Sequence, residues 1–256
     1  MLTLFRRRPD PLARARSHAA AGAWAEAVAL WQPLAEAGDV RAQANLGACL
    51  ATGRGVDADP GEARRWLACA ADAGDRVAGR NLATLLLDTD RAEAVRCYQR
   101  AAEAGDPPSQ DMLSRMLLDG DGVPPDAQAA RHWAEQAAAA GEAAAAARLG
   151  RIHHEAIGTP RDPAAAVHWW HRAALAGDAD AAAMLGAALL LGQGAAADPV
   201  EALAWLLAAS ARGSALPLRF LPAAQRAASA EDNAEAERRA VQRRAAVLPA
   251  GDLIEV

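Results

Sequence analysis

The sequence predicts an all-α fold built as an array of short helical hairpins. A glycine closes an alanine-rich stretch at Gly38, Gly74, Gly105, Gly141, Gly177 and Gly213, with spacings of 36, 31, 36, 36 and 36 residues. A period between about 20 and 50 residues is the signature of a repeat array. Alanine, the best helix former, dominates the composition. Clusters of the strand-favouring residues Val, Ile, Thr and Tyr are absent, so helices are expected throughout.

Each repeat is expected to hold two helices. In the first full repeat, Ala42, Leu46 and Leu50 recur at i, i+4 and i+8, which places them on one helical face. Gly53 and Gly55 then end this first helix, because glycine allows the positive φ angles of a tight turn. The glycine that closes the repeat ends the second helix.

Aspartates are predicted to start the second helices. Asp59 precedes Pro60, and Asp is a preferred N-cap while Pro is tolerated in the first helical turn. Glu62 follows three residues after Asp59, which is the spacing of a capping box. The same Asp recurs in the later repeats, at Asp90, Asp126, Asp162 and Asp198.

A bulky residue recurs eight residues before the closing glycine. Tryptophan fills this position in four repeats, at Trp66, Trp133, Trp169 and Trp205, and Cys97 fills it in the second. We interpret these tryptophans as core packing between neighbouring hairpins. The alternative is a row of aromatic rings that stack on a ligand.

Taken together, these residues resemble the Sel1-like repeat family, a relative of the tetratricopeptide repeats. The resemblance rests on Ala42-Gln43-Ala44-Asn45-Leu46-Gly47, Gly53-Arg54-Gly55-Val56, Asp59, Ala63, Trp66 and Ala70-Ala71, and it covers repeats at 39–74, 75–105, 106–141, 142–177 and 178–213. It implies a right-handed superhelical solenoid of antiparallel helix pairs that acts as an adaptor or scaffold for other proteins. The second repeat departs from the pattern, because it is five residues short and lacks the Gly-x-Gly turn.

The flanking residues are predicted to cap the array. Residues 1–12 are expected to form an N-terminal segment and residues 13–38 a degenerate starting hairpin. Residues 214–256 are expected to supply a charged capping helix, at about 222–247, and a tail. Such caps protect the terminal repeats, which have a neighbour on one side only.

Charge and composition argue against nucleic-acid and membrane functions. The net charge is −5, and the one basic block, Arg6-Arg7-Arg8, lies at the start of the chain. No apolar run reaches the roughly 20 residues of a membrane span, and no secretory signal is recognisable. Cys49, Cys69 and Cys97 lack metal-ligand spacing and are expected to be reduced thiols. We therefore expect a cytoplasmic protein.

The sequence also argues against catalysis. It contains no lysine, which removes Schiff-base chemistry and the phosphate-binding P-loop. The Gly-x-Ser-x-Gly, His-Glu-x-x-His and Cys-x-x-Cys motifs are absent. We expect a protein that is not an enzyme and needs no cofactor.

A protein or peptide partner is expected on the first helices of the hairpins, which line the concave side in related repeats. The resemblance places the concave positions two before and two, five and six after each helix leucine. These positions are Ala44, Ala48, Ala51, Thr52, Arg80, Thr84, Leu87, Asp88, Asp111, Arg115, Leu118, Asp119, Ala147, Arg151, His154, Glu155, Ala183, Ala187, Leu190 and Leu191.

The middle of this series carries most of the charge. The candidate partner-binding residues are Arg80, Thr84, Asp111, Arg115, Arg151, His154 and Glu155. Stacked guanidinium groups suit the carboxylates of an extended acidic peptide or a chain terminus. The alternative is that Asp111, Asp119 and Glu155 neutralise the arginines within a solvated face.

Histidines of the fourth repeat suggest a second class of function. His153, His154, His168 and His171 all fall in one hairpin, and His168 and His171 have the i, i+3 spacing of a zinc-chelating pair. A metal- or small-molecule-binding sensor is therefore the alternative to a non-catalytic scaffold. Against it, His132 and His168 are 36 residues apart and so occupy the same repeat position. The oligomeric state stays open.

Overall fold

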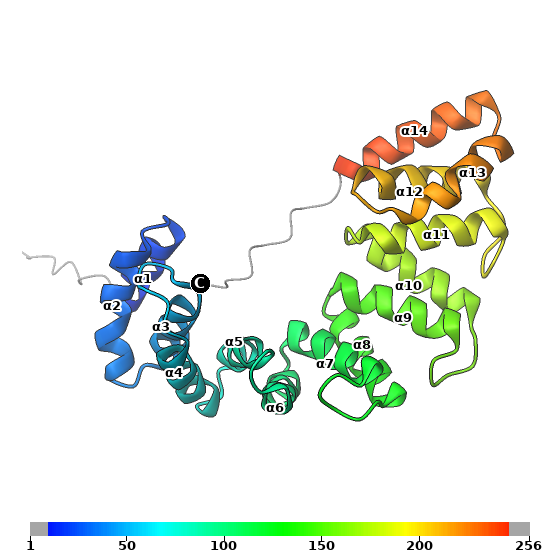
Figure 1. Cartoon of the computed structure of the whole chain (residues 1–256). Coiled ribbons are helices and arrows are strands. Elements are labelled where there is room, and N and C mark those ends of the chain that lie inside the picture. Colours follow the sequence, from blue (N-terminus) through cyan, green and yellow to red (C-terminus); the bar gives the residue numbers. More distant parts are fainter. Residues whose placement is uncertain (1–9, 246–256) are drawn as a thin grey trace, which may run out of the picture. The chain divides into compact units, whose positions relative to one another are not determined.

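The structure, a computed structural model, describes residues 10–245 and is helical without strands over that range (Figure 1). The α-helices are α1 (Pro11–Ala20), α2 (Trp24–Glu36), α3 (Val40–Thr52), α4 (Pro60–Asp72), α5 (Arg76–Leu86), α6 (Arg91–Glu103), α7 (Pro107–Asp119), α8 (Ala127–Ala139), α9 (Ala143–Glu155), α10 (Pro163–Leu175), α11 (Ala179–Leu191), α12 (Pro199–Ala211), α13 (Leu221–Ala227) and α14 (Ala230–Ala245). A short 3-10 helix, η1 (Leu216–Arg219), precedes α13. The predicted all-α fold is confirmed. The arginine block at 6–8 and the tail at 249–256 lie outside the described residues.

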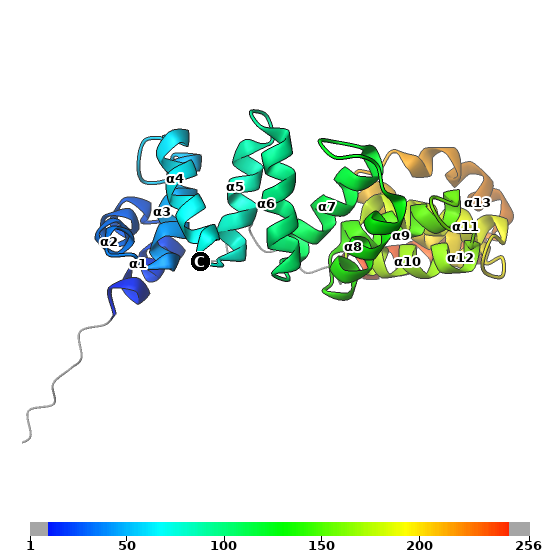
Figure 2. The ribbon, with the colours of Figure 1, turned by 90° about the horizontal axis from the view of Figure 1, so that it is seen from below.

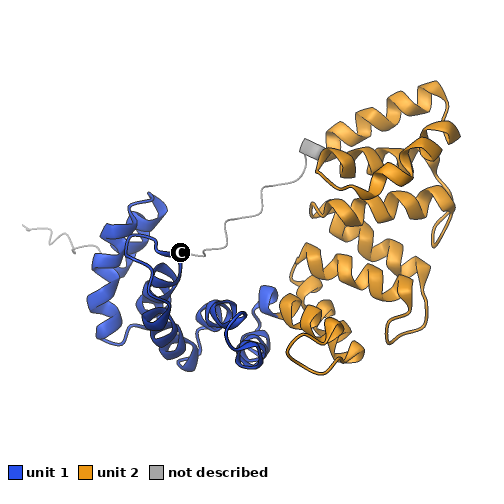
Figure 3. Ribbon diagram, viewed as in Figure 1, with its two compact units in different colours: residues 1–109, 252–256 blue, residues 110–251 orange. Residues whose placement is uncertain are grey.

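The chain divides into two compact units within the first turn of α7 (Figure 3). Among the described residues, unit 1 spans 10–109 and unit 2 spans 110–245. Consecutive helices pack as pairs inside each unit, among them α3 with α4 in unit 1 and α9 with α10 in unit 2. Figures 1 and 2 show one such pair, α5 and α6, lying side by side. The predicted helix pairs are thus present in both units.

The predicted aspartate caps close the hairpin turns. Asp59 accepts a hydrogen bond from the Glu62 backbone N–H at 3.0 Å, and its own N–H donates to the Leu50 carbonyl at 3.0 Å. The other caps repeat this pair of bonds with their own neighbours, at Asp90, Asp126, Asp162 and Asp198. The capping-box interpretation is only half met, because the Glu62 carboxylate pairs with Arg65 instead of returning to the Asp59 backbone.

The second glycine of the turn lies against the preceding hairpin. A Cβ at Gly55 would stand 2.3 Å from the Trp24 carbonyl carbon, and one at Gly194 would stand 2.1 Å from the Pro163 carbonyl oxygen. Both glycines also have positive φ, at +72° and +81°. No side chain fits such an approach, so this glycine allows neighbouring hairpins to pack closely.

In each repeat the residue after the predicted bulky position is the more buried of the two. Trp205 is buried, whereas Trp66, Trp133 and Trp169 are half-buried at the edge of the core. The following residue is at most 4% exposed in every repeat, at Leu67, Tyr98, Ala134, Trp170 and Leu206. The most buried position of the second helix therefore lies one residue further along than the predicted one.

A helical glycine on the first helix makes room for this knob. A Cβ at Gly150 would stand 2.3 Å from Cδ1 of Trp170, and a Cβ at Gly47 would stand 2.8 Å from Cγ of Leu67. Each glycine directly follows the leucine of the repeat motif. Glycine normally costs helix stability relative to alanine, and here the missing side chain admits a large apolar group between paired helices.

The C-terminal cap differs from the single helix predicted at about 222–247. Ala228 has extended backbone, with φ −102° and ψ 145°, which ends α13 and separates it from α14. Ser229 then caps α14, because its Oγ accepts from the Asp232 N–H at 3.1 Å while the Asp232 carboxylate accepts from the Ser229 N–H at 3.1 Å. A local serine cap therefore outweighs the continuous helical pattern.

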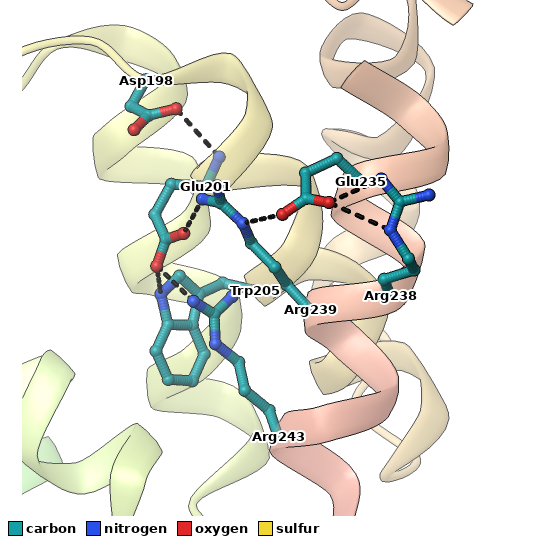
Figure 4. Close-up of polar contacts among 7 residues, drawn as sticks. All are labelled: Asp198, Glu201, Trp205, Glu235, Arg238, Arg239 and Arg243. Carbon is teal, nitrogen blue, oxygen red and sulfur yellow. Dashed lines mark hydrogen bonds and ion pairs between the residues drawn. The ribbon is translucent and has the colours of Figure 1, made fainter. Parts of the chain in front are cut away.

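Glu201 of α12 forms ion pairs with the C-terminal helix α14. Arg239 and Arg243 of α14 both reach its carboxylate, as Figure 4 shows, with Arg239 Nη1 at 3.0 Å from Oε2. Trp205 Nε1 donates to the same carboxylate at 3.0 Å, and the Arg243 guanidinium lies over the Trp205 ring at 4.0 Å. Bonds to Arg239 and Arg238 hold the pKa of Glu235 below its usual value. The charges predicted for the capping helix thus face α12 in part.

Candidate functional site

A groove of about 500 Å³ lies along α3 and α5 in unit 1. The two helices are the first helices of successive repeats, and they contact each other. Small and polar side chains line the groove: Ala44, Asn45, Ala48, Ala51, Thr52, Arg54, Val77, Asn81, Thr84, Leu85 and Asp88. Six of the concave positions expected from the resemblance are among them, including the candidate Thr84. These six positions therefore lie together at one groove.

Two side-chain amides in this groove have no intramolecular partner. Asn45 and Asn81 are half-buried and stand 36 residues apart, at the same repeat position. Within residues 10–245 neither side chain makes a hydrogen bond. The Thr84 hydroxyl, in contrast, is already bonded to the Arg80 carbonyl at 3.1 Å and to the Tyr98 hydroxyl at 2.9 Å. Neither asparagine is among the concave positions expected from the resemblance, although their 36-residue spacing follows the repeat.

The groove carries one positive and one negative side chain, and the buried thiol of Cys49 lies on the same helix, α3. Arg54 and Asp88 contribute one charge of each sign, and the Arg54 guanidinium lies over the Trp24 ring at 5.2 Å. Burial raises the pKa of Cys49 to about 11, an effect that Arg54 opposes only in part. Cys49 is therefore a neutral thiol near neutral pH, as expected for a packed residue.

Two of the predicted partner-binding residues are used inside the protein. Arg80 donates to the Asp106 carboxylate at 2.9 Å, and Asp106 is 2% exposed. Asp111 accepts from Arg148 at 2.7 Å. Both ion pairs are largely buried, so Arg80 and Asp111 stabilise the fold of their own units.

The other charged candidates remain at the surface of unit 2. Arg115 and Arg151 are exposed, and neither forms an ion pair with a carboxylate of the described chain. Arg115 instead contacts the Met112 sulfur at 3.0 Å. Glu155 is exposed as well. The alternative named Asp111, Asp119 and Glu155 as the neutralising groups, and of these Asp111 binds Arg148, which is outside the predicted arginine series.

His154 lies at a small apolar pocket of unit 2. The pocket measures about 110 Å³ and is lined by His154, Pro163, Trp170, Met184, Ala187, Ala188, Leu191, Gln193 and Phe220. The His154 ring is tilted against Trp170 with centroids 5.2 Å apart. Leu191, another expected concave position, is 58% exposed. This pocket is smaller and more apolar than the groove along α3 and α5.

The histidines of the fourth repeat do not converge on one point. His154, His168 and His171 each pack against a different tryptophan, namely Trp170, Trp169 and Trp205. The described residues contain no group of three or more His, Cys, Asp or Glu side chains arranged to hold a metal ion. The metal-sensor hypothesis, which also included His153, finds no support. Contacts between histidine and tryptophan rings account for these histidines instead. His132 and Trp133 make the same edge-on contact as His168 and Trp169, one repeat further along.

None of the described helices is both long and apolar enough to cross a membrane.

Tandem helix pairs with an exposed groove along their first helices define a helical-repeat protein. The Sel1 repeat model matches residues 40–75, 85–106, 107–142, 143–178 and 179–214. The chain therefore belongs to the Sel1 repeat family. The short second match falls on the repeat that lacks the Gly-x-Gly turn. Sel1 repeat proteins generally act as scaffolds for protein interactions.

Solved structures agree with this assignment. The chain is similar to c5321, a protective antigen of uropathogenic Escherichia coli with an SLR fold, with a TM-score of 0.84 and 26% identity over 93% of this chain. It spans about half of that protein, 53% of its length. A Sel1 repeat protein from Oxalobacter formigenes is similar over 92% of this chain and 99% of its own, with a TM-score of 0.76 and 30% identity. No curated protein matches the chain.

Proposed function

We propose that the chain is a non-catalytic scaffold that holds an extended segment of a partner protein in the α3–α5 groove. The observation that carries this proposal is the groove itself, which runs along the first helices of two successive repeats. Membership of the Sel1 repeat family supports it, because these proteins generally act in protein interaction.

The lining of the groove suits a peptide better than a compact small molecule. Ala44, Ala48 and Ala51 keep side chains short along α3, which leaves room for the side chains of a partner. Polar groups are distributed along both helices instead of converging on one point. Small-molecule sites usually combine an enclosed apolar cavity with a few convergent polar groups, and that arrangement is not found in this groove.

Photo-crosslinking tests the location. A benzoylphenylalanine at Ala48, in the groove, is expected to capture a partner, whereas the same group at exposed Arg96 on α6 is not. The captured peptide is expected to come from one continuous segment of the partner. Equal capture of the same partner from both positions would contradict a binding site in the groove.

A second contact surface is proposed on unit 2. Arg115 and Arg151 are exposed cations on the first helices α7 and α9, and His154 follows Arg151 one turn later. Arginine pairs well with carboxylates, so an acidic stretch of the partner fits here. We expect Arg115→Glu combined with Arg151→Glu to abolish capture of an acidic partner with no fall in melting temperature, because neither arginine has a carboxylate partner to lose. Unchanged capture by this double variant would refute the unit 2 surface and leave the groove untouched.

A further inference from the structure

Asn45 and Asn81 present a repeated hydrogen-bonding group to the groove. They occupy the same position on α3 and α5, directly before Leu46 and Leu82. Both are half-buried, both line the groove, and neither amide has a partner in the described chain. Neither amide is among the buried side-chain atoms that lack a partner, so both are accessible to solvent and to a bound segment. A bound segment would supply a hydrogen-bond partner to each.

The chemistry of the two amides matches a peptide main chain. A side-chain amide offers two N–H donors and a carbonyl acceptor without charge, and a peptide group offers one of each. The neighbouring charges favour neither acidic nor basic partners, because Arg54 and Asp88 are of opposite sign. Groups that read the main chain recognise extended conformation more than side-chain sequence.

We propose that Asn45 and Asn81 bind the main chain of an extended partner segment at peptide groups three residues apart. This inference rests on the proposed function and adds what the groove recognises. Packed helices lie about 8–10 Å apart, and α3 contacts α5. A polyproline II segment rises about 3.1 Å per residue with three residues per turn, so its peptide groups return to the same orientation after about 9 Å. In a β-strand, groups three residues apart point to opposite sides, so the amide pair selects a polyproline II-like segment.

The floor between the amides tolerates varied side chains. Ala48 and Ala51 of α3 and Val77 of α5 are small and line the same groove. They form no deep pocket that would demand one residue type. The groove therefore selects a segment by its conformation and by peptide groups that are free to hydrogen-bond. It selects the side chains of the segment mainly by size.

A peptide selection tests this inference. Twelve-residue random peptides displayed on phage are selected on the full-length protein, and the binders are synthesised for fluorescence polarisation. Asn45→Leu combined with Asn81→Leu keeps the side-chain shape and removes the polar atoms. We expect about 10- to 100-fold weaker binding, as for the loss of two neutral hydrogen bonds. The matched control is Gln99→Leu, which removes an exposed amide on α6 and leaves affinity unchanged.

A second arm tests the spacing on the peptide itself. Replacing a peptide bond by an ester removes one N–H, and we expect the sensitive bonds to lie three residues apart. Sensitivity at alternate residues instead would overturn the polyproline II geometry.

A third variant separates this inference from the proposed function. Ala48→Trp fills the groove and is expected to abolish binding of every selected peptide. If Ala48→Trp abolishes binding while the double asparagine variant binds as well as wild type, the main-chain inference fails and the groove stands. If no selected peptide is sensitive to Ala48→Trp, both fail.

Discussion

The first helices of the two units use the same repeat position in opposite ways. In unit 1 this position holds Asn45 and Asn81, which are half-buried, unpaired and open to a groove of about 500 Å³. In unit 2 it holds Met112, which contacts Arg115, Arg148, which is bound to Asp111, and Met184, which lines a pocket of about 110 Å³. The comparison teaches that a repeat position determines where a side chain lies, while its neighbours determine whether a partner can reach it.

Removing the side chain at this shared position should separate the two units most clearly. Arg148→Ala strands the Asp111 carboxylate, and the two side chains are only 11% and 18% exposed. Breaking such a pair costs about 3 kcal/mol of unfolding free energy. Asn81→Ala removes no hydrogen bond of the described chain, so its effect should stay within about 0.5 kcal/mol. Urea unfolding followed by circular dichroism measures both.

The double variant Arg148→Ala with Asp111→Ala serves as the control, because it removes both charges and should recover part of the loss. A similar cost for Asn81→Ala and Arg148→Ala would break the comparison between the units.

The helical glycines should give the next largest difference. A Cβ at Gly150 would stand 2.3 Å from Trp170, whose ring is buried, while a Cβ at Gly47 would stand 2.8 Å from the more adaptable Leu67. We expect Gly150→Ala to cost about 2 kcal/mol and Gly47→Ala about 1 kcal/mol or less, since overpacking is partly offset by alanine's helix propensity. Adding Trp170→Leu to Gly150→Ala should recover stability. Equal costs at both glycines in urea unfolding would show that knob size does not matter.

The sequence predicted the helix pairs well because their signals are local. Capping by Asp59 and its repeats, and the positive φ of the turn glycines, depend on neighbours within a few residues. Six of the concave positions expected from the resemblance also line the groove along α3 and α5. What the sequence did not reveal is pairing between elements: Arg80 with Asp106, and Asp111 with Arg148. These contacts join residues 26 and 37 apart, and they depend on how one hairpin lies against the next.

The tryptophan row shows the same limit. Trp169, which belongs to the predicted row, is half-buried, whereas the adjacent Trp170 is buried where Gly150 leaves room for its ring. Sequence spacing placed the bulky residues on the correct helix. Which of two adjacent positions is buried in the core depends on the packing of one helix against the other.

A turn in unit 2 allows a smaller test of backbone strain. Ala156 replaces the first turn glycine and has φ +60°, a left-handed conformation that costs a non-glycine residue about 1–2 kcal/mol. Ala156→Gly should therefore raise stability by about 0.5 kcal/mol after the chain entropy of glycine is subtracted. The reciprocal change, Gly192→Ala, should lower stability by about 1 kcal/mol, because Gly192 has φ +63° and space for a Cβ. Thermal unfolding of both variants measures the effects, and changes of the same sign would contradict the strain argument.

Thiol labelling measures how accessible the cysteines of unit 1 are, since Cys49, Cys69 and Cys97 all lie in that unit. Burial raises the pKa of Cys49 to about 11, so at pH 8 only about one thiol in a thousand is ionised, and the fraction grows as pH rises toward 11. We expect iodoacetamide at pH 8 to modify exposed Cys69 and to leave Cys49 and Cys97 intact, as measured by mass spectrometry. Labelling of Cys49 as fast as Cys69 would show that unit 1 opens readily.

The central claim is that the α3–α5 groove of unit 1 receives the partner. The most direct measurement is a nitrogen–proton NMR titration of the full chain with a peptide selected on it, following the side-chain amide resonances. Binding in the groove predicts concentration-dependent shifts of Asn45 and Asn81, with the exposed amide of Gln99 unmoved. Shifts confined to the backbone amides of unit 2, at Arg151 and Trp170, with both asparagines unchanged, would contradict the claim.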